Sequence, residues 1–136
     1  MFIKNHQAYR DYRITEKKEA GIILKGAEIK SLRAGRANFS NAILHFSEGE
    51  VFLVGAHISS YSASREKLDP KRTRKLLLNK KEILSWENKM KQGKLTAIPL
   101  QWYNKGNLIK LEIGLGKKKK NGGKKSPRLK SREFRS

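Results

Sequence analysis

The last twenty residues of this 136-residue chain lack the side chains from which a hydrophobic core is built. Residues 117–136 contain ten Lys or Arg, a single acidic residue, Glu133, and only two large apolar side chains, Leu129 and Phe134. Such a segment buries too little apolar surface to offset the entropy lost on folding, so the sequence predicts a disordered basic tail. The fold must then be built from residues 1–116, enough for one compact domain with a modest core.

The charge excess indicates a polyanionic partner. The chain has a formal net charge of +20, of which residues 117–136 carry +9 and residues 1–116 carry +11. So much charge of one sign repels itself in a compact protein, so we expect both parts to meet a polyanion, nucleic acid before anionic membrane. The densest basic cluster of the body runs from Lys71 to Lys75 after an Asp69-Pro70 turn signal. It is expected to begin as an exposed loop that reaches a phosphate backbone, although a merely solvated loop stays open as an alternative.

The composition excludes several classes of protein. There are no cysteines, which rules out disulfide frameworks, Cys-based zinc sites and thiol nucleophiles and fits a reducing setting. No apolar run reaches the ~18 residues of a membrane-spanning helix, and Met1 to His6 lacks the apolar stretch of a secretion signal. We therefore expect a cytoplasmic protein with no membrane segment.

Short strands and two helices account for the apolar pattern of the body. One short helix is expected at residues 27–34, stopped by Gly35, and a second opens at Asn79, whose spacing to Glu82 is that of a capping box, and closes at Gly93. Strand patterns occupy residues 12–24, 42–46, 51–54, 95–103 and 108–115. Many short strands with a couple of helices favour a small antiparallel β-barrel.

Little in the chain suggests catalysis. The three histidines show no metal-ligand spacing, and we expect neither a metal nor a cofactor. The run from Gly114 to Lys117 fails as a phosphate-binding loop, because Leu111 and Lys118 stand where that motif needs Gly and Ser or Thr. Three aromatic residues fall in apolar patterns and are expected in the core: Phe46, Phe52 and Trp86. Three tyrosines are candidates for stacking on unpaired bases: Tyr9, Tyr61 and Tyr103.

Long runs of the chain match one known family. The most specific runs are Gly26 to Gly35 and Asp69 to Leu78, and shorter matches extend from Asn5 to Glu112. With these residues the chain closely resembles the small protein B family, the tmRNA-binding (SsrA-binding) proteins of bacterial trans-translation. The resemblance covers the chain to about residue 120.

The resemblance implies a fold, a function and partners. The fold would be mainly β, an oligonucleotide-binding (OB) type closed antiparallel β-barrel with two or three flanking helices over residues 1–116, followed by the tail at 117–136. Members of this family are not enzymes. They bind the tRNA-like domain of tmRNA and, with elongation factor Tu, escort alanyl-tmRNA to stalled ribosomes, where the unfinished peptide is tagged. We therefore expect a monomer whose partners are tmRNA, the ribosome and, through tmRNA, elongation factor Tu.

The resemblance assigns tmRNA contacts to three residues that are not basic, Glu19, Leu77 and Asn79. Because a carboxylate repels phosphate, Glu19 is expected to accept hydrogen bonds from base or ribose donors or to orient a neighbouring Arg. Asn79 has a competing role as a helix cap. Basic residues of the short helix and of the 71–75 cluster complete the predicted tmRNA-binding set: Lys30, Arg33, Arg72, Arg74 and Lys75.

Family tails enter the empty mRNA channel beyond the decoding centre of the small ribosomal subunit. They carry a basic run, then an aromatic or His, then Asp-Lys-Arg, whereas Gly122-Gly123-Lys124-Lys125 stands at that place here. The chain is therefore expected to hold its tail mainly by charge. The predicted ribosome-binding residues are Lys117, Lys118, Lys119, Lys120, Lys124, Lys125, Arg128, Lys130, Arg132 and Phe134.

Two other functions stay open at this point. A general RNA chaperone or structural ribosomal protein would clamp RNA with the same basic body and show no preference for tmRNA. A nuclease would rest only on scattered His, Glu and Lys residues.

Overall fold

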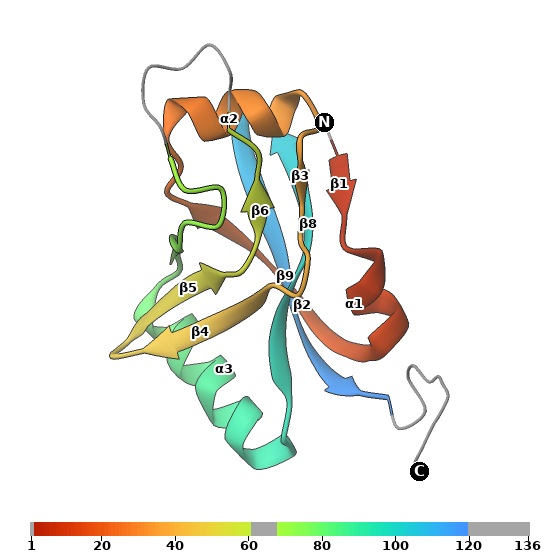
Figure 1. Ribbon diagram of the computed structural model, residues 1–136. Helices are drawn as coiled ribbons and strands as arrows, with labels where there is room; N and C mark the ends of the chain where they lie inside the picture. The colour runs from red at the N-terminus through yellow and green to blue at the C-terminus, as the bar shows by residue number, and fades with distance from the viewer. Residues whose placement is uncertain (1, 61–67, 120–136) are drawn as a thin grey trace.

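The structure is a computed structural model that describes residues 2–60 and 68–119. In this part of the chain three helices and nine strands follow one another (Figure 1). The helices are α1 (His6–Asp11), α2 (Gly26–Arg33) and α3 (Lys80–Gly93). The strands are β1 (Phe2–Lys4), β2 (Tyr12–Ile22), β3 (Ala37–Asn38), β4 (Ile43–Ser47), β5 (Glu50–Val54), β6 (His57–Ile58), β7 (Arg74–Leu77), β8 (Thr96–Lys105) and β9 (Leu108–Lys118).

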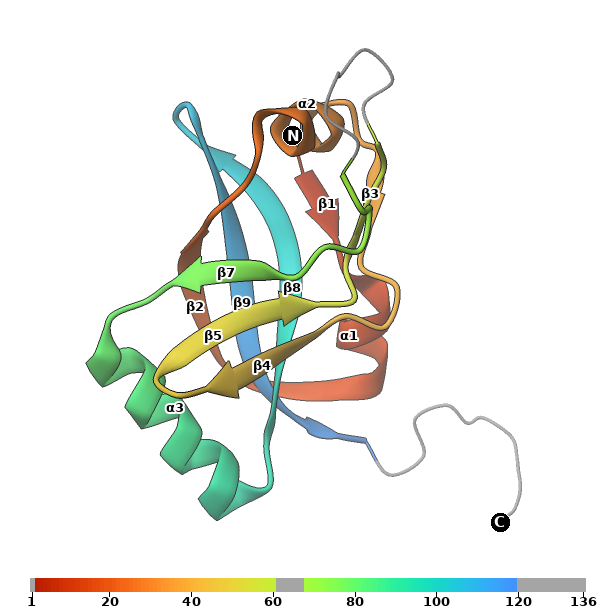
Figure 2. The same ribbon diagram turned by 60° about the vertical axis from the view of Figure 1, so that its left-hand side comes forward.

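Seven of these strands form one strongly curved antiparallel sheet in the order β1-β8-β9-β2-β7-β5-β4, and β3 pairs with β6 as a small second sheet (Figure 2). The two hairpins predicted from the sequence are confirmed as β4–β5 and β8–β9. The predicted helices are confirmed as α2 and α3, and Asn79 caps α3 by accepting a hydrogen bond from the Glu82 amide at 2.8 Å. The chain is therefore mainly β, with three helices.

The sheet is not closed into a barrel, so the predicted closure is wrong. β1 and β4 stand at the two ends of the strand order, and no backbone pairing joins them within residues 2–60 and 68–119. β4 lies against β8 without pairing with it. The physical reason is that the edge of β8 away from β9 is already occupied. β1 pairs with Gln101–Tyr103. The backbone amide of Asn5 donates a hydrogen bond to the Leu100 carbonyl, and its side-chain amide donates one to the Pro99 carbonyl. Pro99 itself has no N–H with which to pair.

One hydrophobic core fills the inner face of the curved sheet. Alternate residues of β9 point into it, including the fully buried Leu111 and Ile113, as the period of a strand requires. α2 and α3 lie at opposite ends of the sheet (Figures 1 and 2) and close the core with Leu32 and Trp86. Trp86 is a core residue as predicted, whereas Phe46 and Phe52 are only partly buried.

The sequence analysis missed α1, which packs on the outer face of the sheet. Ala8 of this helix joins Ile98 and Leu100 of β8 in a second, smaller cluster of buried side chains. The helix begins at Asn5, whose side-chain oxygen accepts a hydrogen bond from the Ala8 amide at 3.2 Å. Gly114 of β9 lies beneath the cluster, since a Cβ atom there would stand 2.8 Å from a methyl carbon of Leu100. α1 thus covers one half of the outer face and leaves the other half open.

A buried ion pair joins α2 to β7. Arg74 has no exposed surface, and its Nε donates to Oε2 of Glu28 at 2.8 Å. Its two remaining nitrogens donate to the carbonyls of Ala56 and Pro70 at 3.0 and 2.9 Å. Burial by itself raises the pKa of Glu28, but hydrogen bonds from Arg72, the Lys25 amide and Arg74 outweigh it and leave this pKa lowered. Every nitrogen of the Arg74 guanidinium and both oxygens of the Glu28 carboxylate therefore take part in a hydrogen bond.

We predict that Glu28→Gln lowers the free energy of unfolding by about 3–5 kcal/mol, because it leaves the Arg74 charge buried without a counter-charge. Urea unfolding followed by circular dichroism measures this. The matched control is Glu50→Gln, which removes a carboxylate from the surface ion pair with Lys75 and is expected to cost no more than about 1 kcal/mol. Equal losses in the two variants would show that the buried pair is not a special constraint.

The Glu28 carboxylate also makes the free energy of unfolding depend on pH. Because the folded-state pKa of Glu28 lies below its ordinary value of 4.5, its stabilisation is present above that pH and is lost as the pH falls through the lowered pKa. The slope of unfolding free energy against pH below 4.5 should therefore be shallower in Glu28→Gln than in the parent chain.

Candidate nucleic-acid interface

The open half of the outer face brings together two of the three non-basic residues that the resemblance singled out. Glu19 and Gly21 are two positions apart on β2 and so point to the same side of the sheet. Gly21 pairs with Leu77 of β7, which therefore lies on that side as well. Leu77 is 54% exposed, and no side chain at Gly21 covers it. An apolar surface and a carboxylate thus stand side by side in the open.

The Glu19 carboxylate is held by two neighbours. The Tyr103 hydroxyl donates to Oε1 at 2.5 Å, and the Lys105 ammonium lies 3.2 Å from Oε2. The hydrogen bond from Tyr103 is the main cause that lowers the pKa of Glu19, and Lys105 and Lys110 add to it. Partial burial and the same carboxylate raise the pKa of Tyr103, so that the phenol stays protonated and remains a donor. The predicted neighbouring Arg is thus replaced by a tyrosine and a lysine.

A row of outward-facing side chains, some exposed and some half-buried, crosses the sheet beside Glu19. Phe2 of β1 pairs with Tyr103, and Tyr103 pairs with Lys110 of β9. The Lys110 ammonium lies 3.7 Å from the point where a Cβ atom of Gly21 would stand, and Leu77 follows on the next strand. Aromatic rings can stack on bases, an ammonium neutralises a phosphate, and a carboxylate accepts hydrogen bonds from base donors. All three groups are presented on one surface.

The predicted tmRNA-binding residues do not all lie on this surface. Asn79 follows β7 by two residues, and its side-chain nitrogen has no hydrogen-bond partner in the described part of the chain. Lys75 points outward like Leu77 and pairs with Glu50. Arg74 is fully buried on Glu28, so its prediction as an RNA contact is wrong: the alternation of β7 turns it into the core. Arg72 binds the same carboxylate at 2.6 Å and is only partly exposed.

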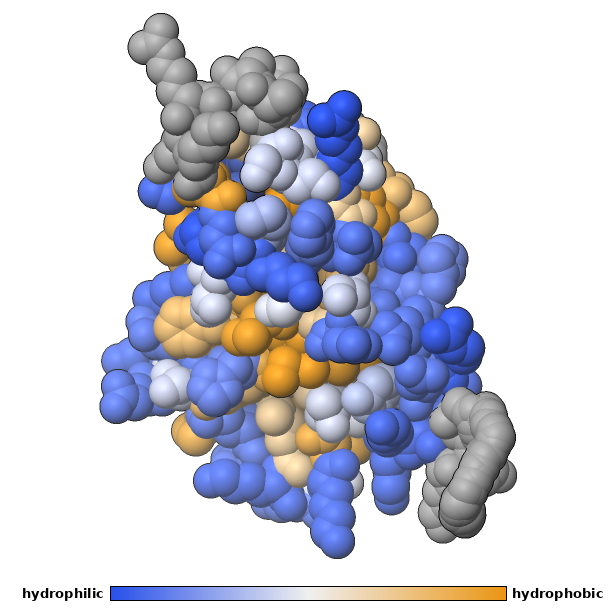
Figure 3. Space-filling model, in the orientation of Figure 1, coloured by the Kyte–Doolittle hydropathy of each residue, from blue (hydrophilic) through white to orange (hydrophobic). Residues whose placement is uncertain are grey.

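The two basic residues predicted on the short helix lie at one end of the sheet. Lys30 and Arg33 are exposed on α2, and Arg33 donates to the carbonyl of Asn107 at 3.0 Å. This bond places the last turn of α2 beside the β8–β9 turn. Figure 3 shows the wider setting: hydrophilic side chains cover most of the visible face, with a hydrophobic band near its middle.

The first residues of the predicted tail belong to the sheet. Lys117 and Lys118 extend β9 and pair with Arg13 and Tyr12, and the Lys119 amide donates to the Asp11 carbonyl at 2.9 Å. β9 thus runs two residues beyond the predicted domain boundary at 116. The other predicted tail residues lie outside the described residues, as does Tyr61: Lys120, Lys124, Lys125, Arg128, Lys130, Arg132 and Phe134.

Residues 2–60 and 68–119 lack two kinds of feature. No group of three or more His, Cys, Asp or Glu side chains there could hold a metal ion. No helix there is long and apolar enough to cross a membrane.

Comparison with known proteins decides the family. The model of the SmpB protein family matches residues 2–136. This chain belongs to the SmpB family. The SsrA-binding protein of Carboxydothermus hydrogenoformans is 48% identical over 118 residues, which cover 86% of this chain and 79% of that protein. That of Geotalea uraniireducens is 47% identical over 121 residues, covering 88% and 80%.

A solved structure described as "tmRNA-SmpB: a journey to the center of the bacterial ribosome" is similar as well. It matches with a TM-score of 0.75 and 40% identity, over 98% of this chain and 91% of that one. The resemblance inferred from the Gly26–Gly35 and Asp69–Leu78 runs is therefore confirmed. The fold described here is shared with an SmpB protein of known structure.

Sequence reasoning missed three members of this SmpB-family surface. The sequence contained a signal for Lys110, because its alternation with the apolar residues of β9 predicts an outward side chain. It contained no such signal for Lys105 or Phe2. Their positions depend on the β8–β9 and β1–β8 registers, which no local pattern reveals. Phe2 is 63% exposed and belongs to a strand of only three residues.

We predict that Tyr103→Phe raises the pKa of Glu19 toward its ordinary value of 4.5, because the variant removes the strongest donor to this carboxylate. A pH titration of the Glu19 side-chain carboxyl signal by NMR measures the change. Tyr9→Phe is the matched control, since Tyr9 lies under the ammonium groups of Lys4 and Lys17 rather than on Glu19. An unchanged Glu19 midpoint in Tyr103→Phe would show that the lysines, Lys105 and Lys110, set this pKa without the tyrosine.

Proposed function

We propose that this chain binds the tRNA-like domain of tmRNA and delivers alanyl-tmRNA to stalled ribosomes for trans-translation. Its relatives are SsrA-binding proteins, and the solved structure that it resembles is a tmRNA-SmpB structure described with the bacterial ribosome. The observation that carries the proposal is the shared outer surface of Glu19, Leu77 and Lys110, with Asn79 directly beyond it. The partners are then tmRNA, the ribosome and, through tmRNA, elongation factor Tu.

The surface supports selection of one RNA rather than general binding of phosphate. A Lys such as Lys110 attracts any phosphate backbone, and this attraction carries no information about the RNA. Glu19 repels phosphate and accepts hydrogen bonds from base or ribose donors. Because Tyr103 and Lys105 orient the carboxylate, it accepts a hydrogen bond only from an RNA donor at one defined position. Leu77 offers an apolar contact to a base or ribose, and the Asn79 amide offers a donor.

Several finer features belong to the same proposal. The chain acts as an RNA-binding monomer in the cytoplasm and not as an enzyme, and it uses no cofactor. Its strand-rich body is a variant of the OB fold in which β1 and Asn5 occupy the edge of β8. Lys30, Arg33 and Lys75 add phosphate contacts around the surface, whereas Arg72 and Arg74 act through Glu28 on its shape.

The basic segment after β9 is proposed to enter the empty mRNA channel at the decoding centre. Lys117, Lys118 and Lys119 are fixed to β2 and to Asp11, so they set where the following residues leave the body. The remaining basic residues up to Arg132 and the aromatic Phe134 would follow ribosomal RNA mainly through charge.

We predict that Leu77→Ala weakens binding to the tRNA-like domain about five- to tenfold, because it removes an exposed apolar side chain that would be buried against a base or ribose. Fluorescence anisotropy at moderate salt, with an ordinary elongator tRNA as competitor, measures the affinity and the preference. The matched control is Leu84→Ala on α3, where the side chain is 60% exposed but lies on another element. Equal affinity of the parent chain for both RNAs would favour the RNA-chaperone alternative.

Two substitutions separate the role of Asn79 as a helix cap from a contact between its side-chain amide and tmRNA. Asn79→Ser keeps a capping oxygen at the start of α3, so unfolding should change by only a few tenths of a kcal/mol, whereas Asn79→Ala should cost about 1 kcal/mol. If the amide contacts tmRNA, both variants lose the same affinity. Full binding by Asn79→Ser would reduce this residue to a structural cap.

Truncation after Lys119 tests the tail. We expect the shortened chain to bind the tRNA-like domain with affinity within about twofold of the full chain, because β9 and the outer surface are intact. Tagging of peptides on stalled ribosomes in a reconstituted translation system should be lost. A truncated chain that still supports tagging would contradict the proposed role of residues 120–136.

A further inference from the structure

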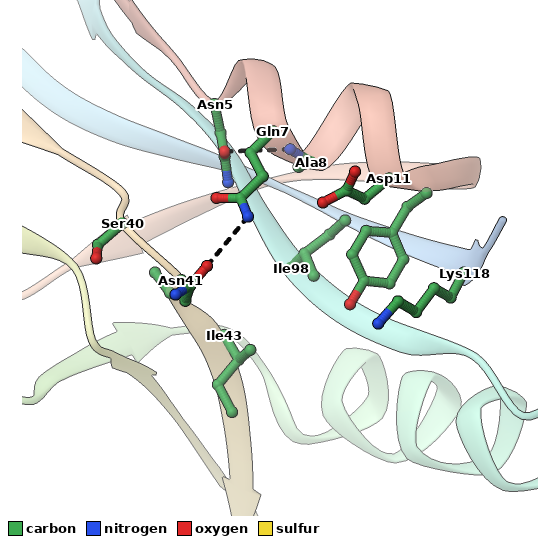
Figure 4. A pocket seen from close by; sticks show the side chains of 11 residues that line it. Asn5, Gln7, Ala8, Asp11, Ser40, Asn41, Ile43, Ile98 and Lys118 are labelled. Atoms are coloured by element: carbon green, nitrogen blue, oxygen red, sulfur yellow. Dashed lines mark hydrogen bonds between the residues drawn. The ribbon is translucent and has the colours of Figure 1, made fainter. Parts of the chain in front are cut away.

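A polar cavity of about 240 Å³ lies between α1 and residues 40–43, away from Glu19 and Leu77. Its walls come from α1 on one side and from the segment that leads into β4 on the other (Figure 4). Ala8, Ala42 and Ile98 give it an apolar floor, and they are nearly fully buried. Of the residues that line it, only Lys118 has a part in the functions proposed above.

The rim of the cavity presents a donor and an acceptor next to each other. The Gln7 side-chain nitrogen donates to Oδ1 of Asn41 at 3.1 Å, which joins α1 to the opposite wall (Figure 4). This bond leaves the Gln7 oxygen as an acceptor and the Asn41 nitrogen as a donor, neither of which has a partner within residues 2–60 and 68–119. An adjacent donor and acceptor match the hydrogen-bonding edge of a nucleobase.

The other end of the cavity is charged and aromatic. Asp11 and Lys118 lie there (Figure 4), together with Tyr12. The Asp11 carboxylate is 3.6 Å from the Arg10 guanidinium and keeps acceptor capacity toward the cavity. A carboxylate and an ammonium group at the same end of the cavity suit the donors and acceptors of a ribose or a nucleobase better than they suit a phosphate, which the carboxylate would repel.

A basic ridge adjoins the cavity. Arg13, Lys117, Lys118 and Lys119 line the neighbouring hollow, and Lys118 belongs to both. These residues stand on paired backbone of β2 and β9 or directly after it, so their backbone positions are fixed. A phosphate backbone that follows the ridge would therefore pass the mouth of the cavity.

We propose that this cavity receives one unpaired nucleobase of an RNA whose backbone lies on the ridge of Arg13 and Lys117–Lys119. The inference rests on the proposed RNA-binding function but names a second site. Lys110 and Lys118 are eight residues apart on β9, which corresponds to roughly 26 Å of strand. One nucleotide cannot reach both the cavity and the surface of Glu19 and Leu77.

Binding of a nucleobase in the cavity is tested with two small molecules on the full-length protein. Adenosine monophosphate is titrated into ¹⁵N-labelled protein and compared with ribose 5-phosphate, which has the phosphate but no base. We expect adenosine monophosphate to shift the side-chain NH₂ signals of Gln7 and Asn41 saturably, and ribose 5-phosphate to shift only signals of the ridge. The same shifts with both probes, or no shift at Gln7 and Asn41, would overturn the proposal.

The source of the base is tested with variants. The Gln7→Ala/Asn41→Ala double variant removes the rim pair, and Asn88→Ala/Gln92→Ala removes an exposed Asn and Gln from α3 as the matched control. Affinity is measured for the isolated tRNA-like domain and for small ribosomal subunits with an empty mRNA channel. We expect at least a fivefold loss for the rim variant on the small subunit, with the tRNA-like domain unaffected.

The outcomes separate this site from the proposed function. A loss confined to the tRNA-like domain would keep the site and assign its base to tmRNA. Unchanged affinity for both RNAs would overturn it, with circular dichroism confirming that the rim variant is folded. Failure of the parent chain to prefer the tRNA-like domain would contradict the proposed function alone, because the nucleotide titration does not depend on tmRNA.

Discussion

The buried ion pair between Glu28 and Arg74 decides how the basic stretch of residues 71–75 is divided between core and surface. A charge as buried as Arg74 is tolerated only with a counter-charge and with hydrogen bonds to its nitrogens, and Glu28, Ala56 and Pro70 supply both. Once Arg74 points inward, the period of a strand turns Lys75 and Leu77 outward. The pairing of Gly21 with Leu77 then brings Leu77 to the side of the sheet that carries Glu19. The candidate interface is thus a consequence of a contact that no RNA touches.

Charge alone does not explain such an interface. Glu19 stands opposite Glu112 on β9, so two carboxylates face each other on a chain of net charge +20. Each is held by hydrogen bonds from β8: Tyr103 and Lys105 donate to Glu19, and the Gln101 side chain donates to Glu112 at 2.9 Å. These bonds offset the repulsion between the carboxylates and keep their orientation. A surface that repels phosphate at one defined place and attracts it all around distinguishes RNAs by shape and by base or ribose donors, which a uniformly basic surface cannot do.

The sequence was sufficient where structure is determined locally and insufficient where it is determined by register. The α3 helix was predictable because Asn79 and Glu82 cap each other within three residues, and the hairpins because apolar residues alternate on both sides of a turn. The burial of Arg74 was not predictable, since it depends on Glu28, which is 46 residues away. The open edge of the sheet was missed for the same reason, because Asn5 meets Pro99 across 94 residues. Glu19 and Leu77 were found only through the family resemblance, as neither residue type indicates RNA binding.

β9 links the parts of the molecule that carry its charge. It begins beside Tyr103 and Lys110, at the outer surface, and it ends at Lys118, from which the basic segment departs. Its inner residues are fully buried and its neighbours on both sides are long strands, so the strand is held along its whole length. A partner bound at one end of β9 and a partner bound at the other are therefore kept at a nearly constant separation, roughly 26 Å between Lys110 and Lys118. Two RNA contacts on one rigid strand can position two RNAs, or two parts of one RNA, relative to each other, which a flexible basic chain of the same charge could not.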